Sequence, residues 1–415
     1  MKKQTFIIFT LVNFVLFTCG LSLAAEKQGT KLATITVQAG PLERVDCPVS
    51  VTLPPRINAF RPMRLVETTG GKEVGLPFQI EPEKPPKLWF VLPGKTPAGS
   101  KRTFELRRDV PVVSGGPVLT LDARSLGVSI GGAPFFTYHH AHVPPPKGVR
   151  FSYIRSAYIH PLFSPRGALL TEDFPPDHLH HKGIWMPWTS TEFEGRHIDF
   201  WNLGKELGTV QFAGYEQVGC GPVYGRFKAK HQHVDLTRPN GGKVVLEEIW
   251  DVRAWAVGGR NAGWWYLDLT SSQTCVADSP LHLNAYRYGG LGYRGPKEWR
   301  DRNYHVLTSE GKTRKDGHAT RAKWCAHSGE INGASTTVVI MCHPDNERFP
   351  EPMRIWPQGG CFFGYVPIQK KPMDLKPGET HVFRYRFYIY EGPIDRERAE
   401  WAWRNFAHPP QATIR

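Results

Sequence analysis

Val382-Phe-Arg-Tyr-Arg-Phe-Tyr-Ile-Tyr390 is the stretch of sequence that most directly indicates the fold. Aromatic or branched side chains occupy alternate positions almost strictly, and Leu375-Lys-Pro-Gly-Glu379 before it is typical of a turn. Because side chains of a β-strand alternate between two faces, this pattern predicts a strand with one buried face and one solvated face.

Strand-like stretches also occur along most of the preceding chain. They contain β-branched or aromatic residues and are separated by Gly- and Pro-rich turns. The only convincing helix covers residues 395–407, which are rich in Glu, Arg, Ala and Trp and end before Pro409. The expected strands are 33–37, 49–53, 87–92, 102–106, 119–121, 128–130, 135–139, 244–252, 264–270 and 336–341.

The composition supports an all-β protein of two domains. Among 415 residues there are 41 Gly and 36 Pro, and 12% are aromatic, which favours strands joined by many turns. Ser114-Gly115-Gly116 is the most linker-like stretch. We therefore predict a small β-sandwich domain over residues 26–115, a large β-sandwich domain over 118–395, and a C-terminal helix and tail over 396–415.

The N-terminus has the order of a secretory signal peptide. Two lysines precede an apolar run at residues 6–17, and small residues follow at Ala24 and Ala25. We predict that residues 1–25 are removed and that the protein is secreted or periplasmic. No stretch reaches the ~18–20 apolar residues of a membrane-spanning helix. The six remaining cysteines permit disulfides in such a compartment, without fixing their pairing.

The charge pattern argues against nucleic acid as a partner. The formal net charge is +14, but the basic residues are dispersed and form no run of five or more. No nucleic-acid motif accompanies them. The segment 294–323 holds nine basic and four acidic residues, and could attract an anionic substrate.

Histidines concentrate in Asp177-His-Leu-His-His-Lys-Gly183. If residues 178–181 are extended, His178 and His180 point to one face and His181 to the other. A His-x-His pair can hold a divalent metal ion, so such an ion is one candidate cofactor, with His178 and His180 as ligands. Alternatively, a histidine here acts as a general acid or base, because its ordinary pKa lies near neutral pH.

Two further stretches supply candidate polar groups. His160 lies beside Tyr158 on one face of an apolar strand, where it is either a site histidine or a hydrogen-bonded core residue. Arg287 and Arg294 flank the glycine-rich turn at 288–293. The glycines let the backbone approach a ligand, and either arginine could bind carboxylate or hydroxyl oxygens.

Aromatic residues follow the histidines over residues 185–201. Trp185, Trp201 and the neighbouring Asp199 combine flat apolar surface with a polar edge, which is how proteins stack on sugar rings. No GxSxG, HExxH or paired-carboxylate motif supports a serine hydrolase or a zinc peptidase.

The stretch 158–201 resembles a family of secreted bacterial proteins called PmoA-like. Their signature looks like Asp-His-Pro-His-His-Arg, followed by a Trp and later by Asp-Phe-Trp, and this chain departs from it at Leu179 and Lys182. The resemblance covers roughly residues 118–395. It implies a β-supersandwich similar to galactose mutarotase, a fold in which His and Arg on a concave sheet commonly meet the sugar.

These observations lead to a hypothesis of a secreted carbohydrate-active protein. We expect an enzyme that acts on a glycan or sugar derivative, which could be anionic, by histidine acid–base chemistry; an epimerase, a lyase and a hydrolase are not separable. The alternatives are a non-catalytic glycan-binding module and a His-ligated metal-dependent oxygenase. The predicted catalytic residues are His160, His178, His180, His181 and Arg294, and the predicted substrate-binding residues are Trp185, Asp199, Trp201 and Arg287.

Overall fold

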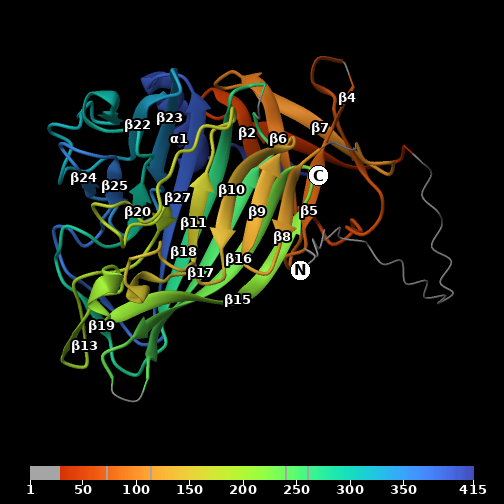
Figure 1. The fold of residues 1–415 in the computed structure, drawn as a ribbon. Coiled ribbons are helices and arrows are strands. Elements are labelled where there is room, and N and C mark those ends of the chain that lie inside the picture. Colours follow the sequence, from red (N-terminus) through yellow and green to blue (C-terminus); the bar gives the residue numbers. More distant parts are fainter. Residues whose placement is uncertain (1–28, 72, 113–114, 239–240, 259–260) are drawn as a thin grey trace, which may run out of the picture.

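The computed structural model describes residues 29–71, 73–112, 115–238, 241–258 and 261–415. The predicted signal peptide at residues 1–25 lies outside this part of the chain. Strands and turns make up nearly all of the described residues, which confirms the all-β prediction (Figure 1). No helix within these ranges is both long and apolar enough to cross a membrane.

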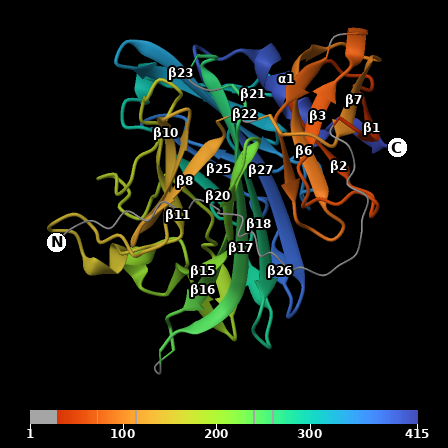
Figure 2. The ribbon, with the colours of Figure 1, turned by 90° about the vertical axis from the view of Figure 1, so that its right-hand side faces the viewer.

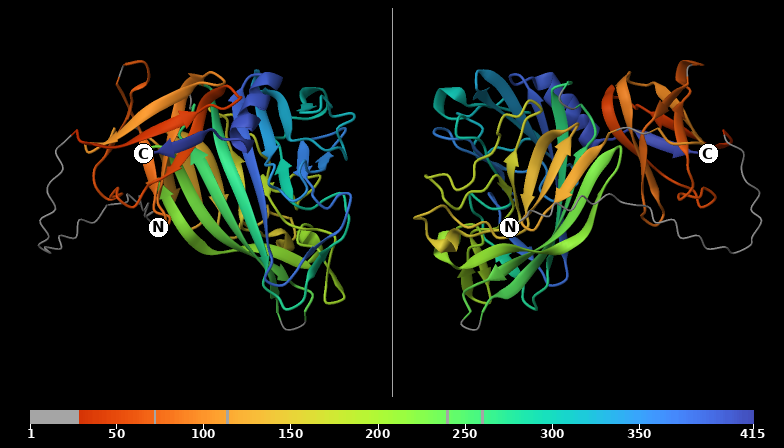
Figure 3. Two further views of the ribbon diagram at one scale, coloured as in Figure 1. Left: turned by 180° about the vertical axis from the view of Figure 1, so that it is seen from behind. Right: turned by 45° about the vertical axis from the view of Figure 1, so that its right-hand side comes forward.

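A small β-sandwich forms from the first strands together with the last one. Its sheets have the orders β28-β1-β7-β3-β4 and β2-β6-β5, and between them lies a core that includes Ile35, Phe90 and Phe104. The C-terminal tail pairs with β1, so that both ends of the described chain share one sheet (Figure 3). The strands are β1 (Lys31–Gln38), β2 (Arg44–Thr52), β3 (Arg64–Glu67), β4 (Val74–Leu76), β5 (Phe78–Glu81), β6 (Lys87–Thr96), β7 (Lys101–Arg107) and β28 (Gln411–Ile414).

Two eight-stranded sheets form the large β-sandwich. The first has the order β24-β25-β20-β12-β11-β10-β9-β8 and carries the histidine segment beside β11 and β12. Its strands are β8 (Pro117–Leu121), β9 (Ser125–Ile130), β10 (Ala133–His139), β11 (Tyr158–Leu162), β12 (Ile184–Trp185), β20 (Leu291–Arg294), β24 (Met353–Ile355) and β25 (Phe362–Tyr365).

The second large sheet is built from longer strands, in the order β15-β16-β17-β18-β27-β23-β22-β21. Side chains from both sheets meet in one core, where the rings of Phe135 and Trp265 lie 4.4 Å apart. Its strands are β15 (Gly208–Cys220), β16 (Tyr224–Asp235), β17 (Lys243–Trp255), β18 (Trp264–Cys275), β21 (His305–Thr308), β22 (Trp324–Ile331), β23 (Ala334–Cys342) and β27 (Thr380–Glu391).

The alternating stretch at 382–390 forms β27 as predicted, but it has no solvated face over its second half. Phe387 and Ile389 point into the sandwich core, whereas Tyr388 and Tyr390 are covered on the outer face. The cover is helix α1 (Arg396–Ala407), which lies against the outside of the sheet (Figure 2). The prediction of a wet face was wrong because the helix follows β27 directly and buries it.

Helix α1 begins where the sequence predicts. The Asp395 side chain accepts hydrogen bonds from the backbone N–H groups of Glu397 and Arg398, which have no partner within the helix. Trp403 of α1 belongs to the same apolar cluster as Trp255, and Trp89 of β6 packs against that cluster. The small sandwich and the large one are thus joined through the helix. The short 3-10 helices are η1 (Thr69–Gly71), η2 (Phe151–Tyr153), η3 (Leu203–Lys205) and η4 (Asp301–Asn303).

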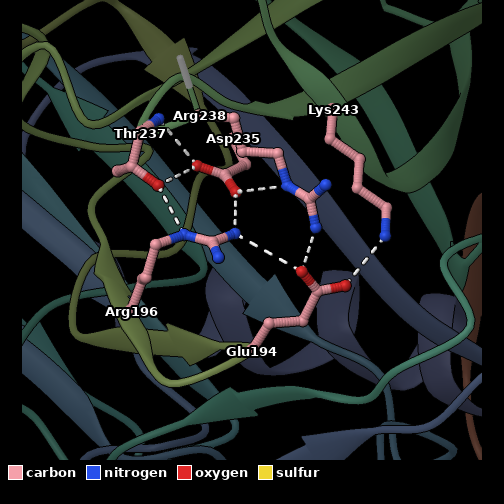
Figure 4. A network of polar contacts seen from close by, with 6 residues as sticks. All are labelled: Glu194, Arg196, Asp235, Thr237, Arg238 and Lys243. Atoms are coloured by element: carbon pink, nitrogen blue, oxygen red, sulfur yellow. Dashed lines mark hydrogen bonds and ion pairs between the residues drawn. The ribbon is translucent and has the colours of Figure 1, made fainter. Parts of the chain in front are cut away.

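A four-stranded sheet closes one end of the large sandwich, in the order β14-β13-β19-β26. Its hairpin is tied to the long strands by the polar network of Figure 4, in which Arg238 and Lys243 both bind Glu194 and Arg196 bridges to buried Asp235 at 2.8 Å. The strands are β13 (Thr191–Phe193), β14 (Arg196–Ile198), β19 (Leu281–Leu283) and β26 (Met373–Leu375).

The six cysteines of the described chain are all free. Five are buried and Cys220 is exposed. Burial raises the pKa of Cys47 and Cys361 to about 12, so these thiols remain protonated at neutral pH. The disulfides that the export prediction would permit do not form in this structure.

Candidate functional site

The three clustered histidines lie in a turn between β11 and β12, and not in an extended segment. The His178 N–H donates to the Pro175 carbonyl at 3.0 Å, and the His181 N–H donates to the His178 carbonyl at 2.8 Å. This turn brings residues 178 and 181 to one side. The condition under which His181 would point to the other face, an extended segment, is not met, and the turn lets all three histidines line one cavity.

The imidazole rings form a compact group. The rings of His178 and His181 are stacked with centroids 4.7 Å apart, and the ring of His180 stands edge-on to His181 at 4.8 Å. The side chain of His178 is 36% exposed, whereas His181 is 1% exposed. The group therefore presents one partly exposed imidazole above a buried one.

An aromatic wall supports the histidines from behind. His181 stacks on Phe362 at 4.9 Å and contacts Trp185 at 5.2 Å, and Trp356 lies 4.7 Å from His178. Gly292 in β20 leaves space for the rings of Trp185 and Trp201 because it has no side chain. A Cβ at Gly292 would lie 2.9 Å from Trp201 and 3.1 Å from Trp185, both closer than ordinary contact. The glycine turn predicted at 288–293 thus serves the packing of the tryptophans.

A cavity of about 230 Å³ opens in front of the histidines. Its walls combine imidazole, amide, hydroxyl and guanidinium groups with aromatic rings. None of the described residues that line it is acidic. The lining residues are His178, His180, His181, Thr189, Trp201, Asn202, Tyr286, Arg287 and Tyr288.

Burial keeps two of the imidazoles neutral. The pKa of His180 is lowered to about 4, mainly by desolvation and in addition by the adjacent His178. Desolvation, with contributions from His180 and Arg294, lowers the pKa of His181 well below its ordinary value. At neutral pH each of these rings therefore has one nitrogen that donates a hydrogen bond and one that accepts.

His178 differs from the other two because a carboxylate lies beside it. Asp177 Oδ2 is 3.3 Å from His178 Nδ1, while Asp177 Oδ1 accepts a hydrogen bond from Arg294 Nη2 at 2.8 Å. Asp177 has a lowered pKa in spite of desolvation, because Arg294 and His178 favour its charged form. Arg294 also pairs with Glu172 at 3.2 Å. It lines a neighbouring cavity of about 140 Å³ and not the histidine cavity, so it positions Asp177 from behind.

Two predicted substrate-binding residues prove to be buried. Trp185 is completely inaccessible and stands in the wall, 4.8 Å from the ring of Trp201. Asp199 accepts hydrogen bonds from the Trp201 and Asn202 backbone and from Lys205 Nζ at 2.9 Å. The carboxylate therefore shapes the loop that delivers Trp201 and Asn202 to the cavity. Trp201 and Arg287, in contrast, line the cavity as the sequence predicts.

His160 does not line the histidine cavity. Its Nδ1 lies 2.9 Å from Thr171 Oγ1, and burial lowers its pKa to about 4. Close by is a buried ion pair that sequence reasoning missed, between Lys182 Nζ and Asp173 at 2.9 Å, with the Tyr158 hydroxyl donating to Asp173 at 2.7 Å. Desolvation lowers the pKa of Lys182 to about 8. His160 belongs to this internal cluster behind the site.

Several buried polar atoms around the site have no hydrogen-bond partner within the protein. Such groups are uncommon in folded proteins and call for an explanation by water, an ion or a ligand. They include the Nδ1 atoms of His178 and His181, the Trp185 indole nitrogen and Arg294 Nη1.

We find no fit to the predicted metal ion. Over the described ranges, no three His, Cys, Asp or Glu side chains form a group that could hold a metal ion. His178 and His180, the two predicted ligands, have ring centroids 5.7 Å apart and an interplanar angle of 74°. No step is therefore routed through a metal ion.

Trp356 and Tyr288 are the site residues that sequence reasoning did not identify. Trp356 lies beyond β24, about 175 positions from the histidines, and only the pairing of β24, β25 and β20 brings it there. Tyr288 follows Arg287 directly, and its hydroxyl accepts hydrogen bonds from Arg354 and Trp356. An aromatic residue next to a glycine turn was a signal that could have identified Tyr288.

Fold and site together define an all-β protein of two sandwiches, with a histidine- and tryptophan-lined cavity formed by the segments next to the interior strands β11, β12 and β20 of the first large sheet. Residues 125–404 match DUF6807, which is described as a family of unknown function, and the chain belongs to that family. None of the curated proteins matches it.

Among solved structures, the chain is similar to parts of larger proteins. A glycosyl hydrolase family 38 protein from Enterococcus faecalis has 9% identity and a TM-score of 0.47, covering 92% of this chain and 47% of that one. An alpha-mannosidase from Enterococcus faecalis V583 has 10% identity and a TM-score of 0.45, covering 92% and 46%. A mutant of heparan sulfate lyase HepC from Pedobacter heparinus has 9% identity and a TM-score of 0.33, covering 70% and 38%. The chain spans less than half the length of each.

Proposed function

We propose that this protein is carbohydrate-active and binds one sugar ring in the histidine cavity. The observation that carries the proposal is the cavity itself: three imidazoles, an amide, a hydroxyl and a guanidinium converge with Trp201 and Tyr288 on about 230 Å³. The volume lies below the ~300–1,000 Å³ of sites for drug-sized ligands, which favours a single ring or the end of a chain.

The chemistry of the walls suits a sugar. A pyranose ring has apolar C–H faces and a rim of hydroxyl groups. Indole and phenol rings cover apolar faces, and polar groups at the edges fix orientation. Neutral His180 and His181 each offer a donor or an acceptor, and Asn202 offers both. The unpartnered Nδ1 atom of His181 is available to a ligand hydroxyl or to water, whereas His178 Nδ1 faces Asp177.

In the enzymatic form of the proposal, His178 is the acid–base group. Its side chain is 36% exposed, and the Asp177 carboxylate at 3.3 Å can stabilise positive charge that develops on the ring during a reaction. His178 would accept a proton from a sugar C–H or O–H and return it to the sugar or to a leaving oxygen, so that no net proton is consumed. Elimination satisfies this balance with His178 alone, because the proton taken from a C–H passes to the leaving oxygen, whereas inversion at a carbon needs a second group on the opposite face.

A non-catalytic glycan-binding module is the second candidate. The low basicity of His180 and His181 favours it, because neutral rings of this kind hold hydroxyl groups without moving protons. The resemblance to PmoA-like secreted proteins, and an exported location, are part of the proposal in either form.

Binding and turnover are separated by one set of experiments on the full chain. Monosaccharides and their uronic acids are titrated by calorimetry, and the mixtures are followed by NMR for new sugar signals. We expect His178→Gln to abolish turnover and to retain binding within about ten-fold. His282→Gln is the matched control, because His282 is exposed and pairs only with Asp374 outside the cavity. Binding without turnover in the unmodified protein would establish the binding module. No binding of any sugar would contradict both forms.

A further inference from the structure

The histidine cavity lies beside a group of unpaired cations. Arg287 lines the cavity, and Arg354 lies 5.0 Å from the Tyr288 ring that forms its wall. Lys370 is exposed, and its charge acts on His318, which contacts Arg354. Over the described ranges, none of the three has a carboxylate within ion-pairing distance. We call Arg287, Arg354 and Lys370 the basic rim.

The positive charges of Arg287, Arg354 and Lys370 all act on one neighbouring residue, His318. His318 contacts Arg354 Nη1 at 3.2 Å, and its pKa is lowered first by burial and then by Arg354, Lys370 and Arg287. No acidic group is among those causes. Three like charges around one imidazole repel each other, and a bound anion would relieve that repulsion.

The acidic groups nearest in the site are already engaged elsewhere. Asp177 is held by Arg294 and lines the neighbouring cavity, and Asp199 accepts hydrogen bonds within its own loop. The cavity wall itself contains no Asp or Glu among the described residues. Therefore no carboxylate in the cavity lining neutralises the positive charge of the basic rim.

Part of the basic segment at 294–323 is used internally. Arg314 donates to the backbone carbonyls of Trp356 and Gly359, and Lys323 pairs with Glu400 at 2.7 Å. These two side chains therefore add no free positive charge at the histidine cavity. The basic rim comes from other parts of the chain.

We infer that the ligand of the histidine cavity is an acidic sugar, whose carboxylate pairs with Arg287 while Arg354 and Lys370 add positive potential. The inference rests on the proposed sugar site and specifies its substrate class. A guanidinium presents two parallel N–H donors that match a carboxylate, and such charge-assisted hydrogen bonds are stronger than neutral ones. The ring then stacks on Tyr288 and Trp201, and its hydroxyl groups face the imidazoles.

The test is a calorimetric comparison of charged and neutral sugars on the full chain. Glucuronate and galacturonate are expected to bind at least about ten-fold more tightly than glucose and galactose. Arg287→Gln should remove that preference, by weakening the binding of the uronates at least about ten-fold more than the binding of the neutral sugars. Arg124→Gln is the control, because Arg124 is exposed in the turn between β8 and β9, away from the cavity lining.

The outcomes separate this inference from the sugar site. Neutral sugars that bind as tightly as the acids would overturn the inference and leave the proposed function standing. Tighter binding of glucose 6-sulfate than of glucuronate would overturn the assignment to a carboxylate. No binding of any sugar would overturn the proposed function together with the inference. As a second readout, NMR titration should show that bound glucuronate raises the pKa of His318 in the unmodified protein and not in Arg287→Gln.

Discussion

Asp177 Oδ2 lies 3.3 Å from His178 Nδ1, at the boundary between two adjoining cavities. Arg294 holds the other carboxylate oxygen at 2.8 Å, so the chain Arg294–Asp177–His178 crosses from the interior to the mouth of the candidate site. This arrangement gives His178 a fixed anionic neighbour, which neither of the other two imidazoles has within ion-pairing distance.

Asp177 is accordingly expected to be a positioning residue. If the protein turns over a sugar, Asp177→Asn should reduce kcat at least about ten-fold and change KM little, because the imidazolium loses its counter-charge. Asp374→Asn is the control, since Asp374 pairs with exposed His282 at 2.8 Å. An unchanged kcat in Asp177→Asn, or a rise in KM without a fall in kcat, would contradict this role of the carboxylate.

His178 and His181 should respond differently to removal of the imidazole. His178→Ala is expected to change the free energy of unfolding by less than about 1 kcal/mol, because the ring is partly exposed. His181→Ala should cost about 2–4 kcal/mol, since it leaves a hole between Phe362 and Trp185. Denaturant unfolding measures both. Equal losses of unfolding free energy in the two variants would mean that the packing of Phe362 and Trp185 does not depend on the His181 ring.

Gly292 should be intolerant of even one added methyl group. A Cβ there would meet Trp201 and Trp185 at 2.9 and 3.1 Å, so Gly292→Ala is expected to destabilise the fold by about 1–3 kcal/mol. It should also quench or shift tryptophan fluorescence. Gly127→Ala in β9 of the same sheet is the control, because its Cβ would meet only the Thr120 carbonyl at 3.8 Å. Similar losses in both variants would show that the effect is general to strand glycines.

The stability of the protein should fall as the pH drops from about 6.5 toward 4.5. Burial lowers the pKa of His160 and His180 to about 4 and that of His327 to about 3. The unfolded chain protonates these rings near pH 6.5, and the folded state does not, so protons favour unfolding through this window.

Buried Glu351 has the opposite effect on stability, which it raises as the pH falls. Its pKa is raised to about 7, so the folded state binds a proton before the unfolded state does. With several histidines against one carboxyl group, the net effect remains a loss of stability. Chemical denaturation at a series of pH values measures it, and Glu351→Gln should steepen the loss. Constant stability between pH 6.5 and 4.5 would contradict the burial of these imidazoles.

Much of the fold follows from local sequence patterns. Strands such as 244–252, 264–270 and 382–390 and the helix at 395–407 have side chains whose period and caps are readable without tertiary contacts. The covered outer face of β27 is not readable in this way, because it depends on where α1 docks. The pairing of the C-terminal tail with β1 likewise joins segments from opposite ends of the chain.

The site was predictable in its composition and less so in its geometry. The histidine cluster, Trp201 and Arg287 were found because they are unusual residues in a short span. The turn at 178–181 was missed because Leu179 and the histidines give no strong turn signal. Trp356 and Arg354 lie in or just after β24, and only the sheet order brings Trp356 to His178 and Arg354 to Tyr288. Their contribution could not be read from spacing along the chain.

The most direct test of the account follows the imidazoles themselves while a sugar is added. In protein labelled with nitrogen-15 at histidine, glucuronate should shift the ring signals of His178, His180 and His181, and Arg287→Gln should move these shifts to at least about ten-fold higher glucuronate concentration. His142 serves as an internal reference, because it lines a separate groove of about 740 Å³. Shifts at His178, His180 and His181 with an unchanged signal of His142 are the result that we predict. Unchanged signals at these three rings under saturating sugar, or shifts only at His142, would contradict the central claim.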